Sequence, residues 1–255
     1  MNLDNQETIA NPLKPLDILE GLSQFPAGAT LSEICSVTNL NKSSTYRILN
    51  ALIDKDYVSR NDSTKTYKLT YKILSISSAV LDTIEIKKIA RTQLLKLSEI
   101  TGETIHLISK DGYEGLYIDK IDTPNTIGLK SQVGKHIPLY CTSGGKVLLA
   151  YSSPAFVQRY LDTVELERWT AKTITDKLKL IEELEIIKQQ GYAVDDEEHH
   201  DDITCISVPI FNKDKSVEAS ISIAAPSFRF SLDLAKSFMP AMKRYADEIT
   251  QNMPY

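Results

Sequence analysis

The chain has 255 residues, of which 42% are hydrophobic and 25% charged, and a formal net charge of −5 at pH 7. This composition excludes a disordered chain, and the length allows one large or two modest domains. The apolar runs are too short to span a bilayer, and three widely spaced cysteines favour a reducing cytoplasm over a disulfide framework.

Residues 1–12 carry acidic side chains and no apolar core. They are therefore expected to form a flexible N-terminal arm rather than a secretory signal. Residues 40–70 hold six basic and three acidic side chains, a net charge of +3, so the rest of the chain sums to −8. A basic segment on an acidic chain is compatible with local contacts to DNA phosphates and with little non-specific binding by the rest of the chain.

The first elements predicted are three helices. Residues 13–24 have helical apolar spacing, and Pro26 ends that pattern. Thr30 and Glu33 have the spacing of a capping box at the start of the second helix. The third helix follows the break at 39–41 and can be capped by Asn41 or Ser43, which completes a helix-turn-helix.

A strand–turn–strand pattern follows over residues 57–60, 61–64 and 65–69. Three helices and a hairpin predict a winged helix-turn-helix DNA-binding domain over residues 13–70. Residues 71–82 continue without Pro or Gly and are predicted to form a helical linker. Residues 83–255 are then a second domain.

The third helix begins with short hydroxyl and basic side chains that can contact phosphates and base edges. Ser and Thr are poor helix-interior residues, so their run here favours a DNA-contacting surface over another capped amphipathic helix. Tyr46 fits a core position equally well, and the wing charges could simply be solvated. The predicted DNA-binding residues are Lys42, Ser43, Ser44, Thr45, Tyr46, Arg47, Arg60 and Lys65.

The second domain is predicted to be α+β, with a mostly antiparallel sheet flanked by helices, because strands cluster early and late around a helical middle. A helix over 84–100 begins this domain. The expected strands are 104–108, 115–121, 126–132, 203–211 and 217–224, and the expected helices are 143–150, 154–161, 176–190 and 232–251.

Residues 143–145 form a small-residue turn that enters a helix. Free backbone N–H groups at such a turn favour an anion, whereas tight packing of the helix on the sheet explains the same residues. Both interpretations remain open on the sequence.

Residues 195–202 are Asp-Asp-Glu-Glu-His-His-Asp-Asp, and Cys205 follows. This cluster could bind a divalent metal, but its spacing matches no structured metal motif, and a solvated acidic turn is the favoured interpretation. An enzyme that uses this cluster, or Cys141 or Cys205 with a histidine, is the alternative hypothesis.

These segments together resemble the IclR family of bacterial transcriptional regulators, from about residue 13 to 253. The Lys-Ser-Ser-Thr-Tyr-Arg-Ile-Leu run at 42–49 is typical of that family's head. The signature of the second domain matches at Pro138, Thr142, Gly145, Lys146, 191–193, Asp195, 197–198, Cys205, Pro209, Ser222, Pro226 and Arg229.

The resemblance implies a DNA-binding regulator, expected to repress a catabolic operon, with no cofactor and no enzymatic activity. It implies a dimer, or a dimer of dimers, on a pseudo-palindromic double-stranded operator. A small organic acid would bind in the second domain, lined by Thr126, Leu129, Ser143, Gly144, Asp195, Ile203, Cys205, Ser220 and Ser222.

Three positions depart from the family's pattern. Asp202 stands where the family commonly has Gly. Ala224-Ala225-Pro226 stands where Ser-Gly-Pro is usual, so a Ser that often faces the ligand is missing at 224. The run at 117–122 is similar to members that control sugar-acid and pectin breakdown and respond to 2-keto-3-deoxygluconate. An aromatic acid or a glyoxylate-type acid is the competing effector.

Overall fold

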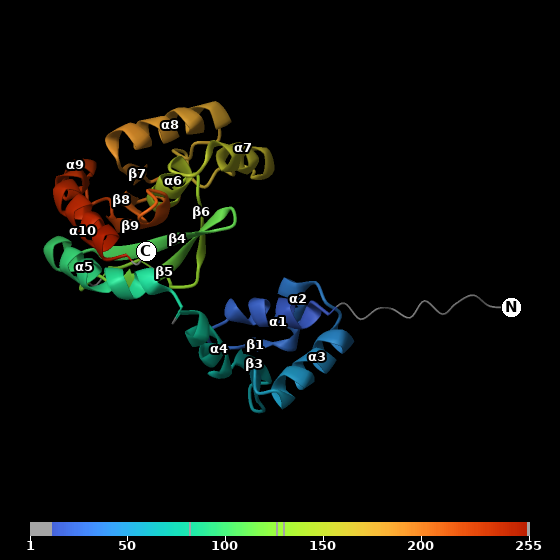
Figure 1. Ribbon diagram of the computed structural model, residues 1–255. Helices are drawn as coiled ribbons and strands as arrows, with labels where there is room; N and C mark the ends of the chain where they lie inside the picture. Colours follow the sequence, from blue (N-terminus) through green and yellow to red (C-terminus); the bar gives the residue numbers. More distant parts are fainter. Residues whose placement is uncertain (1–11, 82, 126, 130, 254–255) are drawn as a thin grey trace. The chain divides into compact units, whose positions relative to one another are not determined.

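The computed structural model describes residues 12–81, 83–125, 127–129 and 131–253. The predicted arm therefore lies outside the described residues except for Pro12. The chain divides into two compact units, Met1–Thr83 and Ile84–Tyr255 (Figure 1). No helix in the described ranges is long and apolar enough to cross a membrane.

The first unit is the predicted winged helix-turn-helix. Its elements are α1 (Lys14–Ser23), β1 (Ala29–Thr30), α2 (Leu31–Thr38), α3 (Lys42–Asp54), β2 (Val58–Asn61), β3 (Thr66–Leu69) and α4 (Lys72–Leu81). The strands form an antiparallel sheet in the order β1-β3-β2. The buried core joins α1, α2 and α3 to the sheet through Ile18, Leu22, Ile34, Leu49, Leu52, Val58 and Tyr67.

Local capping explains the turn between α2 and α3. Thr30 and Glu33 form the predicted capping box. Asn39 ends α2 in the left-handed region (φ 54°), and the Asn41 side chain caps α3 by accepting a hydrogen bond from the Ser44 N–H at 2.8 Å. Of the two caps that the sequence allowed, the structure uses Asn41.

The second unit is an α+β domain. Its elements are α5 (Glu85–Thr101), β4 (Thr104–Asp111), β5 (Glu114–Ile121), β6 (His136–Pro138), α6 (Ser143–Ala150), α7 (Pro154–Thr163), α8 (Lys177–Gln190), β7 (Ala193–Asp196), β8 (Ile203–Phe211), β9 (Val217–Pro226), α9 (Leu232–Ser237) and α10 (Met239–Asn252). The sheet is antiparallel in the order β6-β5-β4-β9-β8-β7.

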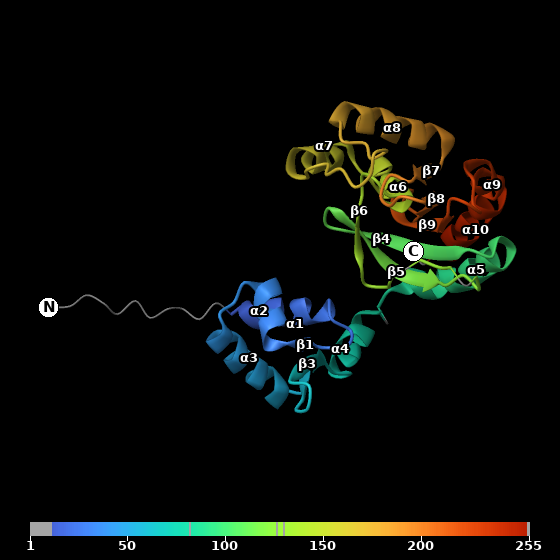
Figure 2. The ribbon, with the colours of Figure 1, turned by 180° about the vertical axis from the view of Figure 1, so that it is seen from behind.

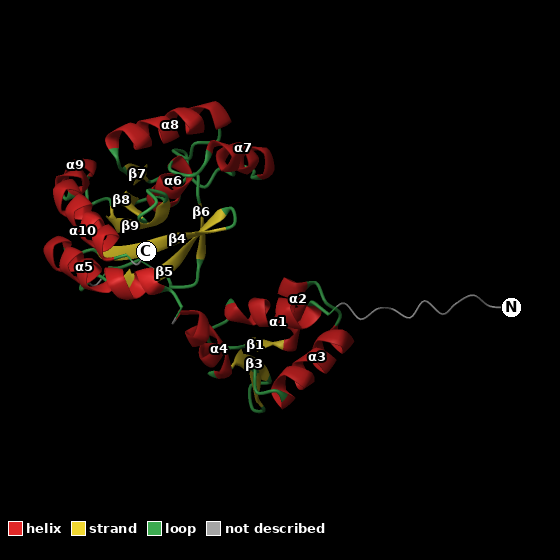
Figure 3. Cartoon of the chain, viewed as in Figure 1, coloured by secondary structure: helices red, strands yellow, loops and turns green. Residues whose placement is uncertain are grey.

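Helices cover both faces of this sheet, as Figures 1 and 2 show from opposite sides and Figure 3 shows by secondary structure. One core packs α5, α9 and α10 against one face, through residues such as Leu94, Ile221 and Ile249. The other packs α6, α7 and α8 against the opposite face, through residues such as Leu148 and Leu184. Strand alternation assigns side chains to the two faces.

Two predicted elements are wrong. No strand occupies the described part of 126–132. There, the Arg229 guanidinium donates to the Ile127 carbonyl at 2.8 Å, and the nearby Thr123 hydroxyl donates to the Gly102 carbonyl at 2.6 Å, so side chains replace ladder hydrogen bonds. The predicted single helix over 232–251 breaks at Phe238, because Pro240 has no N–H to continue the first helix and instead sits in the first turn of α10.

Candidate functional site

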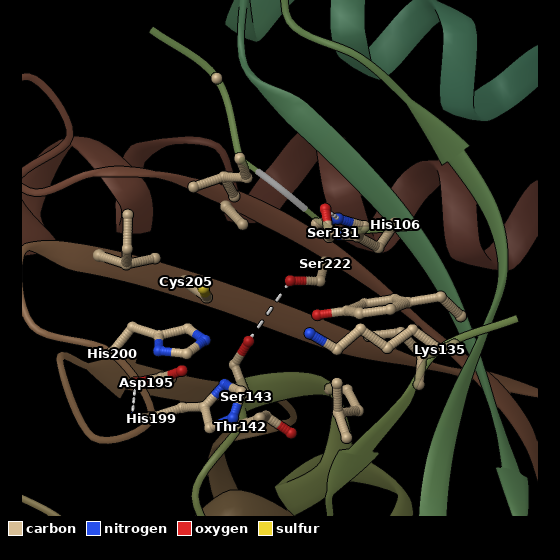
Figure 4. Close-up of a pocket in the computed structure, with 18 residues that line it drawn as sticks. His106, Ser131, Lys135, Thr142, Ser143, Asp195, His199, His200, Cys205 and Ser222 are labelled. Carbon is tan, nitrogen blue, oxygen red and sulfur yellow. Dashed lines mark hydrogen bonds between the residues drawn. The ribbon is translucent and has the colours of Figure 1, made fainter. Parts of the chain in front are cut away.

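A cavity of about 410 Å³ opens on the face of the sheet that carries α6. Its strand residues come from the alternating face of β4, β5, β7, β8 and β9, and His106 lies opposite Ser222 while Cys205 lies opposite Ala224. Figure 4 shows these side chains, the start of α6 and Lys135 around a common space. The volume is typical of a pocket for a small ligand.

The start of α6 is pressed against the sheet. A Cβ on Gly144 would lie 2.2 Å from Ile108 Cδ1, and one on Gly145 would lie 2.6 Å from both Leu139 Cα and the Pro138 carbonyl oxygen. The packing interpretation of this small-residue turn is therefore confirmed. Thr142 caps the helix by accepting from the Gly145 N–H at 3.1 Å.

A row of hydroxyl groups lies beneath that helix start. The Ser143 hydroxyl is 2.7 Å from Ser207 Oγ and 3.4 Å from Ser222 Oγ, the second contact being drawn in Figure 4. Ser220 does not line the cavity, because its hydroxyl donates to the Gly144 carbonyl at 3.2 Å from behind the helix. The predicted ligand contact at Ser220 is thus replaced by a structural one.

Asp195 is the acidic residue of the cavity wall and is 3% exposed. Burial, with a smaller contribution from Glu198, raises its pKa from 3.8 to about 7. Its Oδ1 atom accepts hydrogen bonds from the backbone N–H groups of Glu198 at 2.7 Å and His199 at 3.4 Å. The side chain therefore holds the turn after β7 while facing the cavity.

A buried cation supports the same turn from below. Lys146 of α6 is 1% exposed, and its Nζ lies 2.5 Å from Glu198 Oε1 and 3.1 Å from Glu183 Oε1 of α8. Burial alone would lower the pKa of Lys146, but the two carboxylates outweigh it and raise the pKa. This ion cluster joins α6, α8 and the turn after β7.

The histidines of the cavity are uncharged at neutral pH. Burial lowers the pKa of His106 to about 3 and that of His199 to about 4. His106 Nε2 lies 2.7 Å from Ser131 Oγ, and the His199 ring packs against His200 with centroids 4.0 Å apart. Figure 4 shows Lys135 extending toward the cavity from the loop before β6.

The cavity brings together seven of the nine predicted effector residues, namely Leu129, Ser143, Gly144, Asp195, Ile203, Cys205 and Ser222. Thr126 lies outside the described residues. The sequence interpretation missed His106, Tyr117, Ser131, Lys135, Thr142, His199 and His200 as lining residues. Strand alternation could have indicated His106 and Tyr117, but the loop residues carry no comparable signal.

The thiol and metal alternatives find little support in this geometry. Burial raises the pKa of both Cys141 and Cys205 far above 9, so neither is a thiolate at neutral pH. Asp196 and Glu197 turn outward to Lys172, away from Asp195. Among the described residues, no group of three or more His, Cys, Asp or Glu side chains could hold a metal ion.

The start of α3 presents most of its predicted residues to solvent. Lys42, Ser43, Tyr46 and Arg47 are exposed and Ser44 is half-buried. The predicted DNA contact at Thr45 is corrected by the structure. This side chain is fully buried, and its hydroxyl donates to the Asn41 carbonyl at 3.0 Å. In helical geometry, position 45 shares the inward face with Leu49 and Leu52.

The hairpin between β2 and β3 exposes Arg60 and Lys65. Asn61 shapes its turn by accepting from the N–H groups of Ser63 at 2.9 Å and Thr64 at 3.2 Å. Arg60 also lies 5.8 Å from the Tyr67 ring centroid and 3.7 Å from Asp62. Lys65 occupies the left-handed region (φ 56°) at the tip.

Comparison with known proteins decides the family. Residues 13–62 match the model of the IclR helix-turn-helix domain, and residues 78–251 match that of the bacterial transcriptional regulator IclR C-terminal domain. The chain belongs to the IclR family of bacterial transcriptional regulators. IclR-family proteins are regulators and not enzymes, which removes the enzyme hypothesis.

Individual relatives extend over the full IclR architecture. The transcriptional regulator KdgR of Escherichia coli is 32% identical over 255 residues, covering 100% of this chain and 97% of KdgR. The DNA-binding transcriptional repressor YiaJ of Escherichia coli is 30% identical, covering 94% and 86%. The crystal structure of the Thermotoga maritima IclR superimposes with a TM-score of 0.78 at 36% identity, covering 95% and 98%.

Backbone geometry explains why Asp202 can replace the glycine that is common in the family. Asp202 adopts the left-handed conformation (φ 61°), a backbone geometry that Gly takes at no steric cost. Asp is among the residues that tolerate this region best, and the Asp202 carbonyl accepts a hydrogen bond from the Ser227 N–H at 2.8 Å. The turn therefore keeps its shape without glycine.

Proposed function

We propose that this protein is a cytoplasmic, ligand-responsive repressor of a catabolic operon. Residues 13–70 would bind a pseudo-palindromic operator, residues 71–82 would link the domains, and residues 83–255 would bind a small organic acid. The observation that carries the proposal is the cavity at the start of α6, where Lys135 and a row of hydroxyls face the ligand space.

The DNA-binding part of the proposal places the start of α3 in the major groove. Lys42, Ser43, Tyr46 and Arg47 are exposed there, and Ser44 lies beside them, so they can reach phosphates or base edges. Arg60 and Lys65 of the hairpin would contact the flanking backbone. Thr45 would act indirectly, by packing the helix against its own domain.

Self-association is supported by α4. Leu74, Ile76 and Val80 of this helix, and Tyr71 (88% exposed) directly before it, are apolar side chains that a monomer would leave in water. A dimer that buries them would carry two α3 helices and match a two-fold-symmetric operator. A dimer of dimers is the higher assembly proposed for the full complex.

The cavity favours a hydroxylated acid over a purely apolar one. Ser131, Ser143 and Ser222 offer hydroxyls, and the first N–H groups of α6 with the Lys135 ammonium favour a carboxylate. 2-Keto-3-deoxygluconate has this combination of groups, and KdgR-like identity over the full chain agrees with it. An aromatic acid offers fewer hydroxyls to these serines, which in the free cavity hydrogen-bond to one another and to His106.

Operator binding is tested by fluorescence anisotropy with duplexes from the protein's own upstream region. Arg47→Ala is expected to abolish specific binding while leaving the melting temperature within about 2 °C of wild type, because an exposed helix residue contributes little stability. The matched control is Lys179→Ala, at an exposed position of α8; this variant should bind the operator normally. Equal affinity of wild type for upstream and scrambled duplexes at moderate salt would overturn the DNA-binding proposal.

The effector is tested by thermal shift and calorimetry with 2-keto-3-deoxygluconate, glyoxylate and 4-hydroxybenzoate. A ligand at 100 times its Kd stabilises the folded state by about 2.7 kcal/mol. We expect the sugar acid to give the largest shift and Lys135→Ala to reduce it. A larger shift with 4-hydroxybenzoate would exclude the sugar acid but retain the regulator.

A further inference from the structure

A second cavity, of about 570 Å³, lies between the turn that joins β4 to β5, β6, and the end of α7 with the loop that follows it. Four aromatic side chains line it: Tyr113, Tyr140, Tyr160 and Trp169. Four carboxylates stand among them, namely Asp111, Glu114, Glu165 and Glu167, and His136 is the only basic group among the described lining residues. We propose that this cavity binds a small organic cation, such as a compound with a trimethylammonium group.

The aromatic wall is held in place before any ligand binds. Trp169 Nε1 donates to the Tyr140 hydroxyl at 2.8 Å, and that hydroxyl donates to the Glu167 carbonyl at 2.7 Å. The Tyr113 ring meets the Tyr160 ring edge-on, with centroids 6.0 Å apart and an interplanar angle of 70°. A rigid aromatic wall loses little entropy on binding and suits a cation, because ring faces attract positive charge.

A buried hydroxyl gives independent support for a ligand. Tyr160 is fully buried. The backbone N–H groups of Leu139 and Tyr140 approach its hydroxyl oxygen, but within the described part of the chain the hydroxyl proton has no acceptor. Such groups usually find a partner, since leaving one unmade costs free energy. A polar group of the bound cation, such as the hydroxyl of choline, would supply that partner.

The charges around the cavity select for a cation. His136 Nε2 already lies 2.8 Å from Asp111 Oδ2, so this basic side chain has its partner within the wall. Glu165 and Glu167 are exposed, and neither carboxylate has an ion-pair partner in the described ranges. They would attract an ammonium group, while an organic acid would be repelled from this second cavity.

Trp169 provides a direct readout, because it is the only tryptophan in the chain. Choline is titrated against the full-length protein, with 3,3-dimethyl-1-butanol as the uncharged ligand of the same shape. We expect choline to change Trp169 fluorescence saturably, with at least about tenfold higher affinity than the neutral alcohol. Equal affinity for the two compounds, or no saturable change, would overturn the proposal.

Variants place the binding site. Glu165→Gln with Glu167→Gln should weaken choline binding about tenfold, whereas Glu182→Gln, an exposed acid of α8 remote from the cavity lining, should not. Tyr160→Phe should weaken binding with little change in the melting temperature, because it removes a buried O–H that has no acceptor in the free protein.

Trp169 also packs against His199 of the first cavity, with ring centroids 5.0 Å apart. The titration is therefore repeated with Ser222→Ala, which alters only the first cavity. Unchanged choline affinity in that variant supports the second site. A loss there, with normal binding in the Glu165→Gln, Glu167→Gln double variant, assigns choline to the first cavity and contradicts the proposal.

Discussion

The difference in unfolding free energy between the Asp195→Asn variant and wild type should shift in favour of the variant as pH rises. Asp195 is 3% exposed, and burial raises its pKa from 3.8 to about 7. Between these values the folded state holds a proton that the unfolded state has lost. The contribution of Asp195 to stability is therefore fully present below pH 3.8 and is lost as pH rises through about 7.

The size of the effect follows from these two pKa values. Between pH 5 and pH 8, ionisation of Asp195 should cost wild type about 2–3 kcal/mol of unfolding free energy. Asn has the same shape, cannot ionise and can still accept hydrogen bonds from the N–H groups of Glu198 and His199. The advantage of Asp195→Asn over wild type should therefore grow by about that amount over this range.

Urea unfolding of both proteins at several pH values between 5 and 8 measures this difference. The comparison with wild type is needed because His199 has the opposite effect on the pH dependence of stability. Burial lowers the pKa of His199 to about 4, so its contribution to the unfolding free energy increases as pH rises. That contribution is common to both proteins and cancels. Asp196→Asn is the matched control, since its side chain is 43% exposed and should give a flat difference.

A difference between Asp195→Asn and wild type that stays constant within about 0.5 kcal/mol from pH 5 to 8 would refute this reasoning. A variant that becomes relatively less stable at pH 8 would refute it more strongly. That result would mean that ionised Asp195 is favoured by Lys146 more than burial disfavours it.

Three further substitutions test the packing and charge around α6. Lys146→Met should destabilise the protein by about 3–5 kcal/mol at pH 8 in urea unfolding, because it leaves Glu198 buried without its cation; the loss should shrink at pH 5 as carboxylates take up protons. Gly145→Ala should lower the melting temperature more than Gly144→Ala, since its Cβ meets backbone atoms at 2.6 Å, whereas the Gly144 clash is with the end of the Ile108 side chain. Equal losses for the two glycine variants would contradict the packing argument.

The DNA-binding unit was largely predictable because its signals are local. The Thr30 capping box, the turn at Asn39 and the hairpin each depend on residues within a few positions of one another. The exception is Thr45, which the hydroxyl-rich composition assigned to the DNA surface. Its place on the helix, four residues before Leu49, indicates the buried face, and periodicity was the better guide there.

The residues that line the first cavity were predictable where they lie on strands and not where they lie on loops. Asp195 and Cys205 lie opposite each other across β7 and β8, so alternation places them on one face. Ser131 and Lys135 reach the cavity from a segment without regular structure, where sequence spacing says nothing about direction. The burial of Lys146 could not be predicted from the sequence either. Lysine is almost never fully buried unless it is paired, and its partners Glu183 and Glu198 are distant in the sequence.

The charges of the cavity explain how it could accept an acid although Asp195 lines it. Below neutral pH Asp195 is largely protonated, while burial keeps His106 and His199 uncharged. Lys135 is then the charged group among the described lining residues. A carboxylate would enter a weakly positive site and would hold the proton on Asp195 more tightly. The same burial that costs stability as Asp195 ionises thus keeps the cavity open to an anion.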